Sequence, residues 1–366
     1  MNTKRKTSYT KRTSDLYGKY SFGNMYDKLF SEIGLEDTRK NSVLRDLKSS
    51  DVTLEELKKY HVMDVGTGRQ AYSFLSLGAK AIDHYDISKD HVKRFKSFLR
   101  GKDYPITTTN ANLCEYKLPV QKYDYVYLSG IVHHFENTAV GLKNCAEATK
   151  MGGKIWVQFY RSGTLYWFIV QMMRELAEYE ELENFFLSSA LIYADGDTSN
   201  DITSNLMDDL YVPSINLYPP LEYQEFMSLC GFEVCAEVNI KPVGNLNLLT
   251  AYHTGIFAFK RVREVDLSKL DTGKLLMPEN SVDQLSVTFH KNKDAIKAIK
   301  LFYELKNDLK KTKNANVKFA LMIALHRLYI TKTKFIKKPN LYLKETKNNL
   351  KKINFILSSI SKIFPK

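Results

Sequence analysis

The chain has 366 residues, which corresponds to about two domains of ordinary size. Hydrophobic residues make up 44% of it, so a large core is available, and a wholly disordered or fibrous chain is excluded. Four cysteines are too few for a disulfide scaffold. Their spacing matches no zinc-binding pattern, so no metal site is predicted.

The net charge of +13 is unevenly distributed along the chain. Residues 291–366 hold 20 basic and 4 acidic residues, and residues 1–13 hold 5 basic and no acidic ones. The part between them, residues 14–290, has a net charge of −8. Within it, residues 175–240 contain 14 acidic residues and neither lysine nor arginine. The positive charge therefore belongs to the two ends, and it does not indicate a nucleic-acid partner for the central part.

No segment predicts export or membrane insertion. The positive charges near the first residue are not followed by the apolar stretch of a secretory signal. The most apolar run, residues 165–173, is nine residues long, whereas a membrane span needs about 20. The sequence predicts a soluble, cytoplasmic protein.

The chain is predicted to contain four parts. These are a basic disordered arm (1–13), a main domain (14–261) with a helical insertion (161–217), a connector (262–285) and a basic helical subdomain (286–366). The main domain begins with helical patterns and then alternates short apolar runs with amphipathic segments. Runs predicted to be strands lie at residues 61–65, 81–87, 106–109, 123–128, 154–160, 232–238 and 252–261. This alternation is typical of an α/β fold whose parallel sheet is covered on both faces.

A glycine turn between the first strand and the first helix is the most informative motif. Asp64, Gly66 and Gly68 lie in this turn, where glycine lets the backbone approach a ligand near the free N–H groups of a helix start. Asp86 ends the second strand, 20 residues after Gly66. A carboxylate at that position accepts hydrogen bonds from ribose hydroxyls. The motif indicates a cofactor that contains a nucleoside.

The segments VMDVGTG, YDIS, YDYVYLSGIVHHF and GGKIWVQF resemble the ordered motifs of class I S-adenosylmethionine-dependent methyltransferases. The resemblance covers residues 60–160 and resumes over 215–260, where CGFEV and FAFKR are similar to the closing elements of that family. It implies a Rossmann-like sheet of seven strands, mostly parallel, with the last strand antiparallel. A dinucleotide oxidoreductase is the main competitor, because Gly66, Gly68 and Ala71 also fit its GxGxxA pattern. The later motifs favour the methyltransferase.

The resemblance implies a cofactor site along the carboxyl ends of the first four strands. Its residues are Asp64, Gly66, Thr67, Gly68, Asp86, Ile87, Asn112, Leu113, Ser129 and Gly130. In the family pattern Asp64 orients the turn and approaches the methionine amino group, Asp86 holds the ribose, and the fourth strand ends beneath the sulfonium. Two positions depart from the pattern: Gln70 replaces a third glycine, and Asn112 replaces an aspartate that reads the adenine edge.

His133 and His134 follow the fourth strand, at the edge of the sheet where ligands bind. A histidine there is a candidate base for a protonated methyl acceptor, and His134 is the preferred one. The alternative is that one of them caps the next helix and the other packs in the core.

The insertion has the position of a substrate lid in the family. Tyr160, Tyr166 and Tyr193 are candidate substrate contacts, although aromatic residues there also fit a helical core. Asp208 and Asp209 either cap helices and turns or face a cationic substrate.

The sequence favours an S-adenosylmethionine-dependent enzyme that methylates a nitrogen or oxygen of a small molecule. One alternative is a nucleic-acid methyltransferase that docks through residues 286–366, although no NPPY-like or DPPY-like element follows the fourth strand. Another is a non-catalytic binding or regulatory subunit. The basic end is also compatible with a solvated helical face, an anionic membrane surface or a protein partner. Its charge predicts docking onto the acidic insertion, within one chain or across a homodimer.

Overall fold

The computed structural model describes residues 3–21, 33–175, 182–194, 201–238, 253–273 and 275–279, together with Tyr303 and Asn307. The chain divides into two compact units. The first contains Met1–Ser162, Ala190–Lys241 and Thr254–Glu279, and the second contains Gly163–Ser189, Pro242–His253 and Asn280–Lys366. Apart from those two residues, the predicted subdomain 286–366 lies outside the described residues and stays a prediction.

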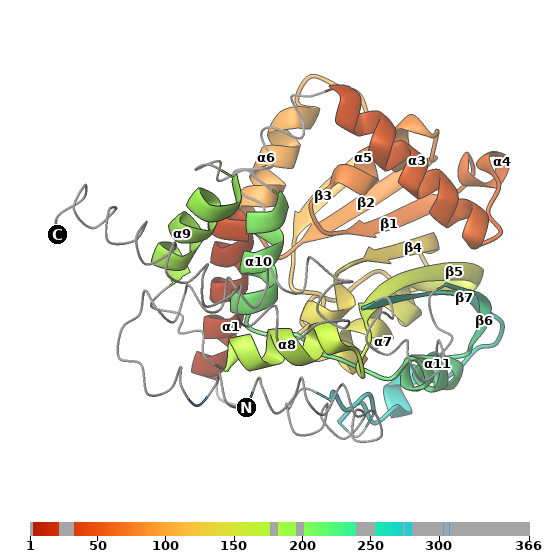
Figure 1. Ribbon diagram of the computed structural model, residues 1–366. Coiled ribbons are helices and arrows are strands. Elements are labelled where there is room, and N and C mark those ends of the chain that lie inside the picture. Colours follow the sequence, from red (N-terminus) through yellow and green to blue (C-terminus); the bar gives the residue numbers. More distant parts are fainter. Residues whose placement is uncertain are drawn as a thin grey trace. The chain divides into compact units, whose positions relative to one another are not determined.

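Seven strands form one sheet in the first unit, in the spatial order β3-β2-β1-β4-β5-β7-β6 (Figure 1). They are β1 (His61–Val65), β2 (Ala81–Asp86), β3 (Ile106–Asn110), β4 (Tyr123–Ser129), β5 (Thr149–Tyr160), β6 (Phe232–Val238) and β7 (Thr254–Arg261). Pairings among the first five strands are parallel, whereas β7 runs antiparallel to β5 and β6. The predicted Rossmann-like sheet, mostly parallel with an antiparallel last strand, is confirmed.

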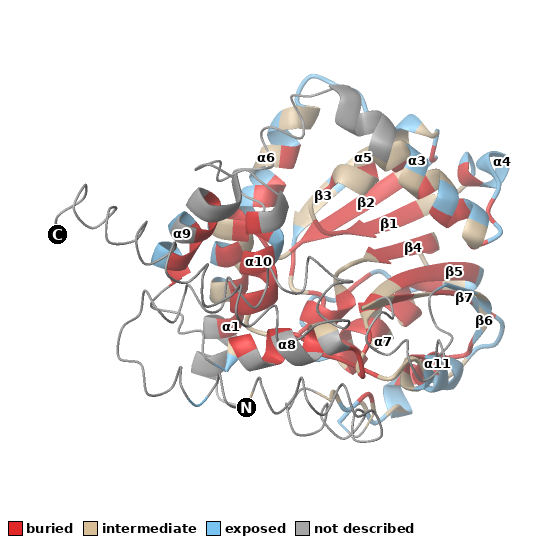
Figure 2. Cartoon of the chain, in the orientation of Figure 1, coloured by how far each residue is buried: buried red, intermediate tan, exposed pale blue. Residues whose placement is uncertain are grey.

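The sheet is buried on both faces, as Figure 2 shows along its central strands. One face packs against helices α3 (Ile33–Ser49), α5 (Arg69–Ser76) and α6 (Lys89–Leu99), and the other against α7 (Thr138–Ala148) and α11 (Pro220–Leu229). Successive side chains of a strand point to opposite faces. In β4, Val126 and Leu128 therefore join the α7 side, and Tyr125 and Tyr127 join the α3 side.

The parallel pairing of β1 with β2 and with β4 places the carboxyl ends of these strands side by side. Helix α5 begins directly after the turn that follows β1, and α6 begins after β2 with Ser88 as its N-cap. A short 3-10 helix, η2 (Val132–His134), follows β4. The segments with the predicted chemistry therefore meet at one edge of the sheet.

In the arm predicted to be disordered, residues 1–13, the described part from Thr3 onward is helical. Residues Thr3–Asp15 form helix α1, which continues as a π-helix, η1 (Leu16–Ser21). Tyr9, Thr13 and Leu16 are buried and recur at intervals of four and three residues, the spacing of one helix face. The high content of lysine and arginine in this segment obscures the buried stripe in the sequence, because net charge does not depend on the spacing of the other residues.

Helices occupy much of the segment predicted as an insertion. Helix α8 (Leu165–Arg174) belongs to the second unit, α9 (Leu182–Ala194) spans the boundary between the units, and α10 (Asp201–Tyr211) belongs to the first. The role of this segment as a substrate lid stays a prediction. Among the described residues, no helix is both long and apolar enough to cross a membrane.

Candidate functional site

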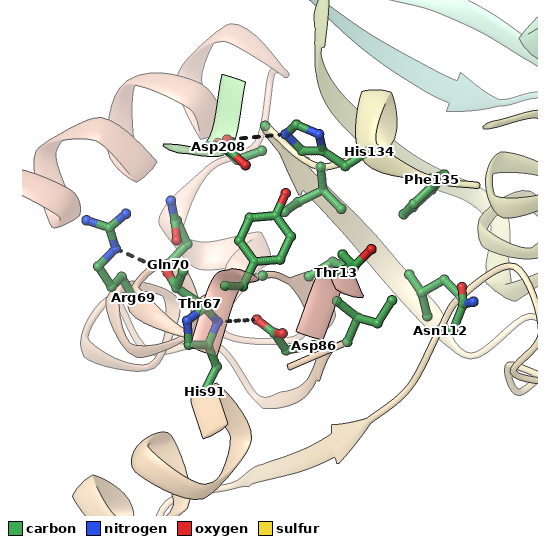
Figure 3. A pocket seen from close by; sticks show the side chains of 18 of the residues that line it. Thr13, Thr67, Arg69, Gln70, Asp86, His91, Asn112, His134, Phe135 and Asp208 are labelled. Atoms are coloured by element: carbon green, nitrogen blue, oxygen red, sulfur yellow. Dashed lines mark hydrogen bonds and ion pairs between the residues drawn. The ribbon is translucent and has the colours of Figure 1, made fainter. Parts of the chain in front are cut away.

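A cavity with a volume of about 260 Å³ lies at the carboxyl ends of β1, β2 and β4, within the first unit (Figure 3). This is close to the lower end of the range for small-molecule sites, about 300–1,000 Å³. Its sheet wall consists of residues that end or follow strands β1 to β4: Val65, Gly66, Thr67, Asp86, Ile87, Asn112, Leu113, Ser129 and Gly130. Its helical wall consists of Tyr9, Thr13, Tyr17, Asn205 and Asp208, from α1, η1 and α10.

The turn after β1 requires two glycines. Gly66 has a φ of +127° and lines the cavity, and Gly68 has a φ of +85° at the start of α5. A Cβ on Gly68 would lie 2.7 Å from the Phe95 ring, so this glycine allows close packing and is not part of the cavity wall. The buried His84 holds the turn from below, with Nε2 at 2.6 Å from the Gly66 carbonyl oxygen.

Asp64 lies beneath the turn and is not among the residues that line the cavity. Its buried Oδ2 accepts a hydrogen bond of 3.1 Å from the backbone N–H of Ala71, in the first turn of α5. Burial raises the pKa of Asp64 to about 7, and the charge of nearby Asp86 acts in the same direction. Asp64 therefore ties the glycine turn to α5.

Asp86, the last residue of β2, presents a buried carboxylate to the cavity. Its Oδ1 accepts a hydrogen bond of 2.5 Å from the Ser88 N–H, and its Oδ2 is 3.1 Å from Nδ1 of His91. Each carboxylate oxygen has two lone pairs, so each keeps one for a ligand. These two acceptor positions fit the two hydroxyls of a ribose, as the sequence predicts.

Apolar side chains of Ile87, Ala111 and Leu113 line the cavity beside Asn112. The amide of Asn112 donates through Nδ2 to Thr10 Oγ1 at 3.3 Å and accepts through Oδ1 from the Cys114 N–H at 3.1 Å. Oδ1 keeps a second lone pair. The site thus combines an apolar surface with one acceptor, which fits the flat, amino-bearing edge of an adenine.

His134 is the predicted catalytic residue that reaches the cavity. Its Nε2 is 3.4 Å from Oδ2 of Asp208 on α10, and its Nδ1 is 3.2 Å from the carbonyl oxygen of Ser214 (Figure 3). Because a carbonyl only accepts hydrogen bonds, the second contact places a proton on Nδ1. The acid–base atom Nε2 therefore faces Asp208, and the pair joins the sheet edge to the helical wall.

His133 is placed differently from its neighbour. Its fully buried ring stacks on the ring of Tyr160, and its carbonyl accepts a hydrogen bond from the Asn216 N–H at 2.7 Å. Only His134 of the predicted histidine pair lines the cavity. For His133 the structure supports the packing alternative.

The three predicted substrate tyrosines lie apart. Tyr160 lines the cavity, and burial together with the charges of Asp209 and Asp208 raises its pKa well above the usual range. Tyr166 belongs to the second unit, where its ring contacts Trp167 and His253. Tyr193 lies on α9, and its side chain is outside what the structure describes.

Sequence reasoning missed most of the helical wall. The hydroxyl of Tyr9 donates a hydrogen bond to the His134 carbonyl. The ring of Tyr17 lies 6.3 Å from that of His91 and 6.0 Å from that of His134, between centroids. Burial and the adjacent Asp208 carboxylate raise the pKa of Tyr17 well above its usual value.

One sequence signal for this helical wall is the interval of four residues from Tyr9 to Thr13 and again from Thr13 to Tyr17. The sequence leaves two roles open for Asp208, a helix cap or a contact with a cationic substrate, and in the structure this residue lines the cavity.

Comparison with known proteins gives one family match. Residues 63–157 match the model of a family described as a methyltransferase domain. This range contains the end of β1, the whole of β2, β3 and β4, and most of β5. It therefore contains the strand ends that form the sheet wall. No curated protein matches the chain.

Several solved structures are similar to the chain at low sequence identity. A Haloferax volcanii methyltransferase in complex with the activator Trm112 is 13% identical, over 65% of this chain and 98% of that one, with a TM-score of 0.38. An S-adenosylmethionine-dependent methyltransferase from Mesorhizobium loti is 16% identical, over 55% and 91%, with a TM-score of 0.37. The Burkholderia thailandensis 1,6-didemethyltoxoflavin-N1-methyltransferase, with S-adenosylhomocysteine bound, is 11% identical, over 72% and 92%, with a TM-score of 0.39. At such low identities and TM-scores, these proteins do not indicate the substrate of this chain.

Proposed function

We propose that this chain, a class I S-adenosylmethionine-dependent methyltransferase, transfers the methyl group to a nitrogen or oxygen of a small molecule, with His134 as the base. One observation carries the proposal. The Asp86 carboxylate and the His134–Asp208 pair line the same cavity. A nucleoside-binding group and an acid–base group therefore line one cavity, as a displacement between cofactor and acceptor requires.

The residues of the sheet wall fit the cofactor. A Cβ on Gly66 would lie 3.1 Å from Cδ1 of Ile131, another residue of the cavity, so a side chain at this turn would crowd the space. Asp86 offers two open lone pairs for the ribose, and Asn112 offers one for the adenine amino group. When bound, S-adenosylmethionine supplies a methyl group on a positively charged sulfur. Thr67, Ile87, Leu113, Ser129 and Gly130 complete the proposed contacts, while Asp64 and Gly68 support them from behind.

His134 receives the proton that a hydroxyl or ammonium acceptor must lose. With Nδ1 already bonded to the Ser214 carbonyl, Nε2 is the nitrogen that accepts it. The carboxylate of Asp208, 3.4 Å away, stabilises the charge that then forms on the ring. The half-buried side chains of Tyr17 and Tyr160 line this end of the cavity and reduce its contact with water.

The same surroundings support an acceptor that carries an amine. Asp208 supplies a negative charge, and Tyr160 adds the face of an aromatic ring. Docking of nucleic acid through residues 286–366, and association into a homodimer, remain separate proposals that concern residues outside the described parts. Nucleic acid that co-purifies with the full chain and is lost at high salt would favour the first, and sedimentation equilibrium measures the second.

Calorimetry with S-adenosylhomocysteine tests the cofactor site directly. We expect binding to the wild-type protein and a loss of about 1–3 kcal/mol in Asp86→Asn, because the amide cannot accept both ribose hydroxyls. Asp103→Asn, in the exposed loop before β3, is the matched control and should bind like the wild type. Absence of binding to the wild-type protein would refute the proposal.

The acceptor class is tested by following S-adenosylhomocysteine formation. Small phenols and amines are offered in one series and total RNA in another. Turnover with small molecules alone supports the proposal. Turnover with RNA alone would replace it by the nucleic-acid alternative.

A further inference from the structure

A second cavity of about 160 Å³ adjoins the first one, and we call it the side cavity. The two share Arg39, Gln70 and Ser129 in their walls. The side cavity extends from there over the ends of β4 and β5, where Trp156 and Gln158 line it, toward Arg45 on α3. Both cavities belong to the first unit.

Two buried hydrogen-bond donors around the side cavity have no acceptor among the described residues. They are Nε1 of Trp156, whose side chain is 2% exposed, and Nε of Arg39. Indole and guanidinium N–H groups only donate, so each needs an acceptor as its partner. A buried donor without an acceptor is energetically unfavourable. A ligand with hydrogen-bond acceptors would therefore fit the side cavity.

The charges of the side cavity favour an anionic acceptor. Arg39 and Arg45 supply two positive charges, and Asp46 is the carboxyl group among the lining residues. The Oδ2 of Asp46 accepts a hydrogen bond of 2.7 Å from the Tyr127 hydroxyl, and its Oδ1 lies 3.8 Å from Nε of Arg45. Asp46 is thus occupied by its neighbours, and the positive charge of Arg39 is left for a ligand.

We propose that the side cavity binds a carboxylate or phosphate group of the methyl acceptor, held by Arg39 and the indole N–H of Trp156. The acceptor would then extend from Arg39 past Ser129 to the His134–Asp208 pair. This inference rests on the proposed function. It deepens that function by naming an acidic substrate, and an amine beside Asp208 would make the substrate zwitterionic.

The position of the side cavity favours the acceptor over the cofactor as the source of this anion. Of the sheet-wall residues that the sequence assigns to the cofactor, only Ser129 also lines the side cavity. Apart from Gly130, the other assigned residues end or follow strands β1, β2 and β3. The side cavity lies over β4 and β5. The carboxylate of the cofactor is nevertheless chemically equivalent, so the experiment must separate the two.

The chain contains two tryptophans, and this makes the indole N–H a specific probe. Trp167 donates its Nε1–H to the His253 carbonyl at 2.8 Å, within the second unit, and serves as an internal control. Full-length protein labelled with ¹⁵N-tryptophan is saturated with S-adenosylhomocysteine and titrated with inorganic phosphate and then with acetate, at an ionic strength held constant with chloride. We expect the Trp156 signal alone to shift downfield and to saturate. Trp167→Phe assigns the two signals.

Arg39→Gln should weaken this response at least tenfold, whereas Arg100→Gln, an exposed arginine after α6, should leave it unchanged. The proposal is wrong if the Trp156 signal does not move, if both signals move together, or if chloride has the same effect. It is also wrong if S-adenosylhomocysteine itself shifts Trp156 and blocks phosphate, because the cavity then holds the carboxylate of the cofactor. If S-adenosylhomocysteine does not bind at all, the proposed function fails, and the titration of the ligand-free protein still tests the cavity.

Discussion

The two walls of the main cavity are built in different ways. The sheet wall comes from short segments that each follow a strand, and parallel pairing alone brings them together. The helical wall comes from α1, η1 and α10, and the bond from Tyr9 to the His134 carbonyl spans 125 residues. The first wall can therefore be read from local sequence, whereas the second depends on tertiary packing.

The strongest contrast between the walls is expected in catalysis. His134→Asn and Asp208→Asn should each lower turnover, with His134→Asn losing about 10²–10⁴-fold, the usual contribution of a general base. Both should bind S-adenosylhomocysteine like the wild type, because neither residue is assigned to the cofactor. Steady-state kinetics and calorimetry measure the two effects.

Asp86→Asn provides the reciprocal control for this contrast. It should weaken cofactor binding while retaining most of its turnover at saturating cofactor. If Asp208→Asn weakened cofactor binding as much as Asp86→Asn does, the two walls would not have separate roles.

The fold was largely predictable because its signals are local. The sequence predicts six of the seven strands within two residues of their observed bounds, since each apolar run is bounded by turn residues. The strand β5 begins at Thr149, five residues before the predicted start. The sequence predicts Gly66 and Asp86 as site residues because glycine and a carboxylate each have a specific role at the end of a strand in this fold. The sequence does not predict the helix Thr3–Asp15, because net charge does not reveal a buried stripe such as Tyr9, Thr13 and Leu16. The choice between His133 and His134 depends on α10 and on Tyr160, which no local pattern supplies.

The glycine turn behind the sheet wall should tolerate little added volume. Gly68→Ala combines a φ of +85° with a Cβ placed 2.7 Å from the Phe95 ring, so we expect a loss of about 2–4 kcal/mol in the free energy of unfolding. Gly101→Ala is the matched control. It has a φ of +76° with nothing within 4 Å, so only the backbone term of about 1–2 kcal/mol remains. If urea unfolding gave equal losses of unfolding free energy for the two variants, the Phe95 ring would be able to move aside without destabilising the protein.

Asp64, beneath the glycine turn, makes the stability of the folded protein depend on pH. Its pKa is about 7 in the folded protein, whereas an unfolded aspartate titrates near pH 4. The folded state binds more protons between these values, so the free energy of unfolding falls as the pH rises from about 4 to 7. The slope from this group is at most about 1.4 kcal/mol per pH unit. Urea unfolding of the ligand-free protein should show a flatter dependence in Asp64→Asn and an unchanged one in Asp103→Asn. A wild-type slope in Asp64→Asn would contradict the assignment.

Removing the Tyr9 hydroxyl should have the smallest effect on stability, and it tests whether α1 belongs to the cavity. Tyr9→Phe loses one hydrogen bond to the His134 carbonyl, about 0.5–1.5 kcal/mol. Local opening of α1 exposes the Lys11 and Arg12 peptide bonds, so the rate of tryptic cleavage there reports its stability. If α1 covers bound cofactor, S-adenosylhomocysteine should slow this cleavage in the wild type, and Tyr9→Phe should speed it in the free protein. Tyr116→Phe, with an exposed ring far along the chain, should leave the rate unchanged. Cleavage that proceeds equally fast with saturating S-adenosylhomocysteine would remove α1 from the helical wall, and the cavity would then be built by the sheet edge and α10 alone.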